Sequence, residues 1–263
     1  VLLGFLGLLT VVFPIYMIVS NAFKPTLLIR KMPPQFFFPP TLQHYVKILK
    51  QGNFLSYFGN SFIIAMSTTV ISIVLGSLAA YGLAIMKSNW GNRISTFLLF
   101  SKLVPTITIM IPLYIILDKV HLLGTYVGPI LAHVSVNAPF VAWLVLGFIR
   151  DIPGDLFEAG KLDGCTRMQV FWKIVFPLLS PAIGSALLLV MQYSWNELLF
   201  SMQYTNLHTY TLTVGVSRFV GAISVDWGQS SAAATIVMVP IIIAGFFLQK
   251  YLVSGLTAGA VKG

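Results

Sequence analysis

Long apolar runs, separated by shorter polar segments, follow one another along the whole chain. A membrane-spanning helix needs about 20 mainly apolar residues, and six runs reach roughly that length: 1–20, 59–86, 94–117, 127–149, 181–203 and 231–253. The alternating ten-residue strands of a transmembrane barrel are absent from the sequence. The pattern therefore predicts an all-α, polytopic membrane protein with six transmembrane helices, built as one domain over residues 1–263.

The segments between the predicted spans differ in composition. Residues 21–58 are rich in proline and aromatic residues and carry five Lys or Arg residues without an acid. Residues 204–230 form the other long segment on the same side of the membrane. An excess of Lys and Arg normally marks the cytoplasmic side, but placing 150–180 in the cytoplasm gives eight basic residues there against seven on the other side. The charge count alone therefore leaves the orientation open.

The polar segment between the fourth and fifth spans has a helical pattern of its own. Asp155 followed by Glu158 has the spacing of a capping box, so a short helix is predicted to begin at Asp155. Gly164 then supplies a helix stop. A second capping box at Thr166 reopens the helical pattern, and Pro177 is expected to close it because proline cannot continue a helix interior. The sequence therefore predicts a helical hairpin.

Composition places the chain among membrane proteins and excludes several functions. Hydrophobic residues make up 57% and charged residues 9% of the chain, against about 25% charged in soluble domains. The net charge of +9 suits contact with anionic membrane lipid, whereas the scattered basic residues argue against nucleic-acid binding. Because the sequence contains no phosphate-binding loop, zinc motif or nucleophile elbow, the chain is expected to bind no cofactor and not to be an enzyme.

Polar residues inside the predicted spans mark a candidate pathway. An ionisable residue within a span is costly, so its presence suggests a function. A rise of about 1.5 Å per residue places Lys102 roughly 12 Å, Gln192 roughly 16 Å and Glu197 roughly 24 Å into the membrane. Asn137 lies about halfway across a core of about 30 Å. Lys102, Asn137 and Gln192 are therefore expected to form one layer near the midplane, with Glu197 too far away to pair with Lys102.

The same layer has the chemistry of a site for a hydroxylated solute. On the fifth span, Gln192 shares a helical face with Asn196, and Tyr193 shares one with Glu197. Amide and ammonium groups can hydrogen-bond the hydroxyls of a sugar, while aromatic rings pack against its C–H surfaces. The predicted substrate pathway consists of Lys102, Asn137, Gln192, Tyr193, Asn196 and Glu197. The alternative is that these residues only join helices through hydrogen bonds.

Residues of the polar hairpin resemble the EAA motif of ABC-importer permeases. The matching positions are Glu158, Ala159, Gly164, Ile174 and Pro177, with Asp163 before the glycine. Gly160 stands where the motif has a second alanine, and Phe176 stands where it has leucine. Further matches resemble the carbohydrate-uptake branch, the relatives of the smaller membrane subunit of the maltose permease: Asn60-Ser61, Ala79-Ala80-Tyr81, Pro139-Phe140, Trp195-Asn196-Glu197 and the ending from Gly255 to Gly263.

This resemblance implies a type I ABC-importer permease domain with six helices and a cytoplasmic coupling hairpin. It implies a partner permease of similar fold, two ATP-binding cassette subunits that hold ATP and magnesium, and an extracytoplasmic solute-binding protein. The residues implied in ATPase coupling are Phe157, Glu158, Ala159, Gly160, Asp163, Gly164, Ile174 and Pro177. Phe157, Phe171 and Trp172 are expected to anchor the hairpin in an apolar groove of the ATPase, although a purely structural hairpin is the alternative.

The function expected from the resemblance is import of an oligosaccharide by alternating access, in a multi-pass subunit of the inner membrane. The basic outer segment and Lys102 fit an acidic, uronate-type saccharide, whereas Glu197 argues against one. Glycerol phosphate would fit the same charges, and an ABC importer for glycerol phosphate or a polyol is the alternative function. A secondary transporter or channel without an ATPase is the rival class, and a signalling or scaffold protein is a more distant one.

Overall fold

The computed structural model describes residues 2–50, 53–86, 90–219 and 225–258, and the elements within these ranges are helical. Fourteen α-helices and one π-helical turn have the following bounds: α1 Leu2–Phe23, α2 Thr26–Ile29, α3 Gln43–Lys50, α4 Phe54–Ala84, α5 Trp90–Ser101, α6 Thr106–Lys119, α7 Val127–Arg150, α8 Gly154–Leu162, α9 Arg167–Val170, the π-helical turn Phe171–Val175, α10 Phe176–Leu178, α11 Ser180–Asn196, α12 Leu199–Tyr204, α13 Leu212–Ser217 and α14 Trp227–Ala258. The predicted all-α class is confirmed.

Three of the described helices are long and apolar enough to cross a membrane, namely α4, α7 and α14 from Trp227 to Phe247. Two bent helix pairs are also long and apolar enough to cross a membrane when each pair is taken as one segment. One is α5 with α6, bent by 94°, and the other joins Arg167–Leu178 to α11 with a bend of 78°. Counting each pair as one span gives five, and α1 adds a shorter apolar helix. The multi-pass architecture is therefore confirmed, while the count of six spans stays a prediction.

The predicted third span, 94–117, is broken in the structure. Helix α5 ends at Ser101, and α6 begins only at Thr106 and runs off at 94°. Pro105 precedes α6, and proline both lacks a donor N–H and disfavours the helical conformation of the residue before it. The break places Lys102 on irregular backbone rather than within a continuous span.

The chain divides into two compact units, one of residues Val1–Ser61 and Leu207–Ile243, and the other of Phe62–Asn206 and Ala244–Gly263. The prediction of a single permease domain stays a prediction.

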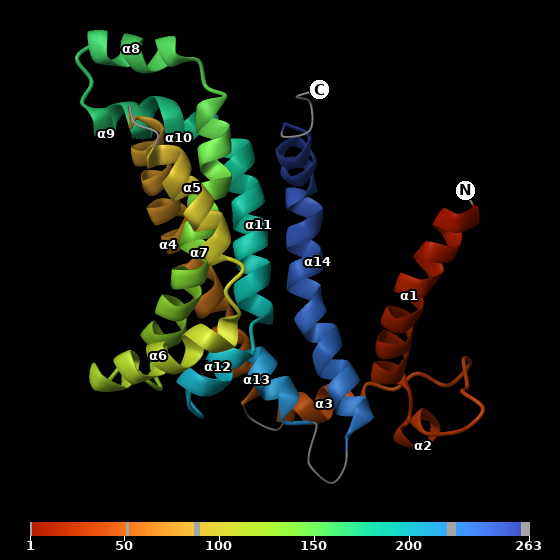
Figure 1. The fold of residues 1–263 in the computed structure, drawn as a ribbon. Helices are drawn as coiled ribbons and strands as arrows, with labels where there is room; N and C mark the ends of the chain where they lie inside the picture. Colours follow the sequence, from red (N-terminus) through yellow and green to blue (C-terminus); the bar gives the residue numbers. More distant parts are fainter. Residues whose placement is uncertain (1, 51–52, 87–89, 220–224, 259–263) are drawn as a thin grey trace. The chain divides into compact units, whose positions relative to one another are not determined.

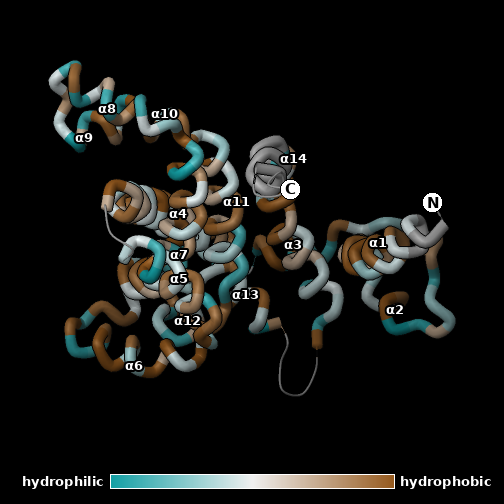
Figure 2. The backbone as a smooth tube through the Cα atoms, turned by 45° about the horizontal axis from the view of Figure 1, so that its top comes forward, coloured by the Kyte–Doolittle hydropathy of each residue, from teal (hydrophilic) through white to brown (hydrophobic). Residues whose placement is uncertain are grey.

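In the second unit, α4 (from Phe62), α5, α7 and α11 run side by side, and the hairpin of α8–α10 lies at one end of them (Figure 1). A close approach holds α4 against α7, because a Cβ atom at Gly76 would lie 2.6 Å from Cβ of Val141. Small residues permit such contacts between spans. Figure 2 shows polar stretches on the hairpin, whereas α6 is mostly hydrophobic. The bundle therefore carries its polar hairpin at one end.

In the first unit, two polar residues of α4 anchor the segment that leads into α13. The side-chain amide of Asn60 donates hydrogen bonds to the carbonyls of His208 and Tyr210, at 2.9 and 3.0 Å. The hydroxyl oxygen of Ser61 accepts a hydrogen bond of 2.7 Å from the backbone amide of Leu212. The Asn60-Ser61 pair thereby ties together parts of the chain about 150 positions apart.

Candidate functional site

The first helix of the hairpin, α8, begins at Gly154, with Pro153 at the N-cap and no side-chain cap. The predicted cap at Asp155 is therefore wrong. Pro153 presets the backbone for the start of the helix, so the helix begins before Asp155 can cap it. The carboxylate of Asp155 lies instead in the first turn, where it interacts favourably with the positive end of the helix dipole.

The end of α8 at Gly164 is confirmed. Gly164 has φ of +78°, the left-handed conformation that glycine adopts without a steric penalty. The amide of Cys165 donates to the carbonyl of Gly160 at 3.0 Å, and the amide of Gly164 donates to that of Lys161 at 3.1 Å. These two bonds form a Schellman motif. They fix the direction in which the chain leaves α8.

The second half of the hairpin begins at Thr166, as predicted, and continues past Pro177. Thr166 and Gln169 form a complete capping box. Pro177 does not close the helix, because the π-helical turn Phe171–Val175 precedes it and the helix continues to Leu178. In that turn the amide of Phe176 donates to the carbonyl of Phe171, so the hydrogen-bond register has widened before proline removes a donor. The chain then bends by 78° into α11.

The EAA-like residues divide into a packed set and an exposed set. Gly160 is buried, and a Cβ atom there would lie 2.8 Å from Cδ1 of Ile174 and 3.1 Å from Cγ2 of Val170. This close packing explains why glycine suits the position of the motif's second alanine. The exposed set consists of Glu158, Ala159, Asp163, Gly164 and Pro177.

Tyr81 of α4 connects the span to both halves of the hairpin. Its ring stacks on Phe157 with a centroid distance of 6.4 Å, and its hydroxyl donates to the carbonyl of Arg167 at 3.0 Å. The predicted role of Phe171 as an anchor for a partner is wrong, because Phe171 is fully buried in this chain's own core. Trp172 remains 42% exposed. The aromatic residues therefore fasten the hairpin to the spans, with Trp172 on its outside.

Lys102 and Asn137 meet in the structure, whereas their expected common layer with Gln192 near the midplane stays a prediction. The ammonium of Lys102 donates to Oδ1 of Asn137 at 3.3 Å. It also lies 4.6 Å from the ring centroid of Tyr193 and 5.1 Å from that of Phe140. A cation over an aromatic face gains electrostatic stabilisation that grows when water is excluded. The break after α5, helix α7 and helix α11 thus contribute to one polar and aromatic site.

The remaining predicted pathway residues lie differently. Gln192 and Asn196 are exposed, and the side-chain amide of Asn196 donates to the backbone carbonyl of Gln192 at 2.9 Å. These two residues share one face of α11, as their spacing predicts. Glu197 is buried and has partners of its own, so it does not pair with Lys102 in the structure.

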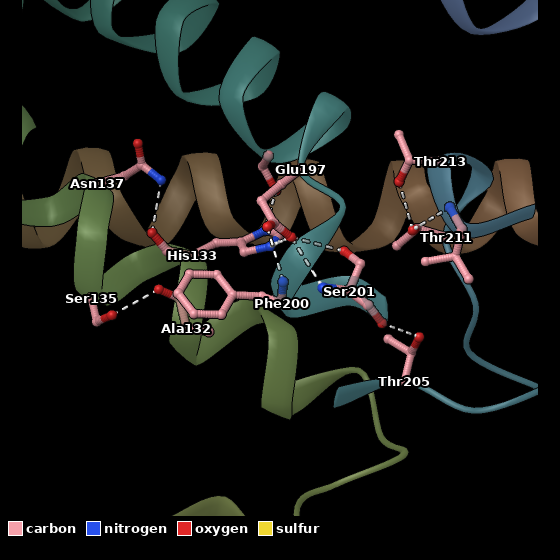
Figure 3. A network of polar contacts seen from close by, with 12 residues as sticks. Ala132, His133, Ser135, Asn137, Glu197, Phe200, Ser201, Thr205, Thr211 and Thr213 are labelled. Carbon is pink, nitrogen blue, oxygen red and sulfur yellow. Dashed lines mark hydrogen bonds and ion pairs between the residues drawn. The ribbon is translucent and has the colours of Figure 1, made fainter. Parts of the chain in front are cut away.

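Glu197 and His133 form a buried polar network (Figure 3). Glu197 lies at the C-terminal end of α11, and α12, which follows it, lies at the end of the bundle opposite the hairpin (Figure 1). The carboxylate of Glu197 accepts hydrogen bonds from Nε2 of His133 at 3.1 Å and from the amides of Phe200 and Ser201 at 2.9 and 3.0 Å. With that proton on Nε2, Nδ1 of His133 accepts from the hydroxyl of Ser194 at 2.7 Å. Glu197 thereby satisfies the free amides at the start of α12.

His133 is a member of this network that the pathway predicted from the sequence does not include. A lone histidine in a span carries no sequence signal beyond its own cost of burial. Its position four residues before Asn137 was the available clue, since the two share a face of α7. In the structure this face of α7 is directed at α11 and at Glu197 directly after α11. Through Asn137 it also contacts Lys102 in the break after α5.

Apolar spans, a rigid polar hairpin at one end and polar groups among the helices together define a membrane transport subunit. The chain belongs to the family of binding-protein-dependent transport system inner membrane components, whose model matches residues 72–258. The resemblance to ABC-importer permeases is therefore confirmed, and the chain is a multi-pass component of the inner membrane.

Two curated relatives illustrate this membership. The chain is 34% identical over 250 residues to the trehalose/maltose transport system permease protein MalG of Thermococcus litoralis, covering 94% of this chain and 89% of the relative. It is 31% identical over 261 residues to the diacetylchitobiose uptake system permease protein DasC of Streptomyces coelicolor, covering 98% and 94%. The resemblance to the carbohydrate-uptake branch is thus confirmed.

A solved structure shares the fold. A chain of a bacterial ABC transporter involved in the import of the acidic polysaccharide alginate superposes with a TM-score of 0.81, at 20% identity, over 95% of this chain and 93% of that one. At this identity the likeness shows the fold alone.

Proposed function

We propose that this chain is the permease subunit of an ATP-driven importer for an oligosaccharide. It works with a second permease of similar fold, two ATP-binding cassette subunits that bind ATP and magnesium, and an extracytoplasmic solute-binding protein. The observation that carries the proposal is the Tyr81 linkage, which joins a span to both halves of the EAA-like hairpin. The family membership and the relatives named for sugar uptake support it.

The hairpin is suited to transmit motion from a partner. Capping and the Schellman motif make its two short helices rigid, and the packing of Gly160 on Ile174 joins them. On the outside, Leu162 is 88% exposed and Glu158 is also exposed. A movement of the ATPase subunits would therefore reach α4 through Tyr81. In this proposal the EAA-like residues couple ATP hydrolysis to opening and closing of the pathway.

The Lys102 site is suited to meet the solute. Tyr193 and Phe140 offer aromatic faces, and Asn137 offers an amide beside the ammonium. We expect a saccharide ring to compete with Lys102 for these faces. An acidic, uronate-type saccharide gains an additional ion pair with Lys102. Glu197 does not oppose such a charge strongly, because its carboxylate is already bound by His133 and two backbone amides.

Co-expression with the candidate partner subunits tests this proposal. The tagged chain should co-purify with nucleotide-binding subunits, and loaded binding protein should stimulate their ATPase activity. Stimulation by neutral and by uronate oligosaccharides, compared in wild type and Lys102→Met, tests the solute class. A larger loss for the uronate supports the acidic saccharide, and equal losses contradict it. A chain that transports sugar in a purified state free of ATPase subunits would instead be a secondary transporter.

A further inference from the structure

A cavity of about 440 Å³ lies between α8 of the hairpin and the ends of α4 and α7. Its charged lining consists of Arg150, Lys161, Arg167 and Glu158. Much of the remaining wall is apolar, with Tyr81, Ile149 and Phe157 among its residues. The cavity therefore combines a basic lining with an apolar surface.

The charges of this lining do not neutralise one another. Three cations against one carboxylate leave a net charge of +2. Within the described ranges, neither the Lys47–Asp226 ion pair nor the His133–Glu197 contact involves any of these four residues. Nη2 of Arg150 donates to Oδ1 of Asn92 at 2.6 Å, and this neutral partner positions the guanidinium without cancelling its charge. The cavity is thus suited to an anion.

The position of the cavity indicates the source of that anion. Helix α4 ends at Ala84 and α7 ends at Arg150, and both helices are long and apolar enough to cross a membrane. Basic residues at the ends of spans lie at the level of the lipid headgroups, and basic pockets between transmembrane helices bind anionic headgroups. An ion from solution would use the basic groups but not the apolar wall.

We propose that this cavity binds an anionic phospholipid. Arg150 and Arg167 hold its phosphate, and the parts of its acyl chains nearest the glycerol lie against the apolar wall. The lipid bridges α8 to the ends of α4 and α7. Helix α8 also carries Glu158, one of the residues that contact the ATPase in the proposed function. The bound lipid would therefore hold in place the helix that the proposed function requires to be rigid. The dependence of ATPase coupling on this lipid rests on the proposed function, whereas lipid binding itself does not.

Native mass spectrometry of the intact complex tests the site. The complex is placed in nanodiscs of zwitterionic lipid with and without phosphatidylglycerol, and the retained phosphatidylglycerol is counted. The test variant is Arg150→Gln with Arg167→Gln. The matched control is Lys119→Gln with Lys173→Gln, which removes two exposed charges outside the cavity. We expect the test variant to bind the lipid about 30-fold more weakly, since each basic residue near an anionic surface contributes about fivefold, and the control to match wild type.

A second variant and a second ligand keep the result interpretable. Arg150→Lys with Arg167→Lys preserves both charges and should retain the lipid, which covers the case in which the glutamine variant does not fold. Equal retention in the wild type and a folded glutamine variant would overturn the proposal. Inorganic phosphate that binds as well in discs free of anionic lipid, with the same dependence on both arginines, would also overturn it. So would a loss of ATPase subunits from the glutamine variant with its lipid unchanged, because a partner protein would then occupy the cavity.

Discussion

Nε2 of His133 lies 3.1 Å from the carboxylate of Glu197, and both side chains are buried. This contact joins α7 to the break between α11 and α12, where the carboxylate also holds the amides of Phe200 and Ser201. It holds Glu197, the C-cap of α11, four residues beyond Tyr193. The pair therefore supports the Lys102 site from the side opposite the hairpin.

Replacing His133 by alanine is expected to lower the free energy of unfolding strongly. The variant removes a hydrogen bond to a buried carboxylate, and hydrogen bonds to charged groups typically contribute about 1.5–3 kcal/mol. The change is measured as the thermal unfolding midpoint of the purified protein in detergent. Ser135→Ala, on the exposed face of α7, is the matched control and should shift the midpoint little. A midpoint for His133→Ala close to that of the control would contradict the structural role of the pair.

The ring of Tyr193, rather than its hydroxyl, is expected to matter for transport. Tyr193→Phe keeps an aromatic face for Lys102 and for a sugar, whereas Tyr193→Ala removes it. A cation–π contact at a half-buried site is worth about 1–2 kcal/mol, so we expect about a five- to thirtyfold loss of transport for alanine and a small loss for phenylalanine. Initial uptake rates in proteoliposomes provide the comparison. Equal losses in the two variants would show that the hydroxyl is the important group.

Close packing at Gly160 is expected to tolerate alanine and not valine. The nearest contact, Cδ1 of Ile174, is the flexible end of a side chain, so alanine can be accommodated by a small shift. Valine adds branched bulk against Val170 and Ile174, and overpacking typically costs about 1–3 kcal/mol. The two variants should differ in the number of ATP molecules hydrolysed per sugar transported. A displaced α8 in Gly160→Val would couple ATP hydrolysis to transport poorly and raise this number. Wild-type coupling in Gly160→Val would show that the two hairpin helices need not pack closely.

Asp226 makes the start of α14 sensitive to acid. Burial acts to raise the pKa of this carboxyl, but hydrogen bonds from Gln229 and the charge of Lys47 outweigh burial and lower the pKa. A depressed folded-state pKa means that the charged form stabilises the fold above the unfolded pKa of about 4. That stabilisation is lost as the pH falls through the still lower folded value.

The acid sensitivity of this contact can be measured directly. Asp226→Asn retains a capping oxygen and removes the charge, so its stability should depend less on pH below about 4 than that of wild type. The measurement is the unfolding midpoint across that pH range. If the unfolding midpoint falls equally with acid in wild type and Asp226→Asn, the acid sensitivity comes from other carboxyl groups.

The sequence predicted much of the fold and the hairpin for identifiable physical reasons. Membrane spans follow from long apolar runs, and the stop at Gly164 and the cap at Thr166 follow from local backbone chemistry. Helical rise placed Lys102 and Asn137 at similar depths, but it did not indicate that the two side chains meet. The helix stop and the cap depend on residues that lie near one another in the chain. An expected depth in the membrane depends only on the number of residues from the start of a span.

What the sequence missed depends on contacts between distant segments. The break before Pro105 was hidden in an apolar run whose length fitted a continuous span. Phe171 has the character of an exposed anchor in sequence, yet in the structure it starts the π-helical turn and packs into the core. The partner of Glu197 lies 64 positions away, so no local pattern indicated that its carboxylate is held by His133.

Oligosaccharide uptake by the reconstituted complex tests the central claim, that this chain couples ATP hydrolysis on partner subunits to sugar passage. The comparison is between wild type and Glu158→Lys with Ala159→Arg, which alters two exposed positions of α8 and leaves the turn at Gly164 unchanged. Wild type should accumulate sugar only with ATP and the binding protein, and the double variant should remain assembled in part but lose both uptake and sugar-stimulated ATPase activity. Normal uptake by the double variant, or wild-type uptake without ATP, would contradict the account.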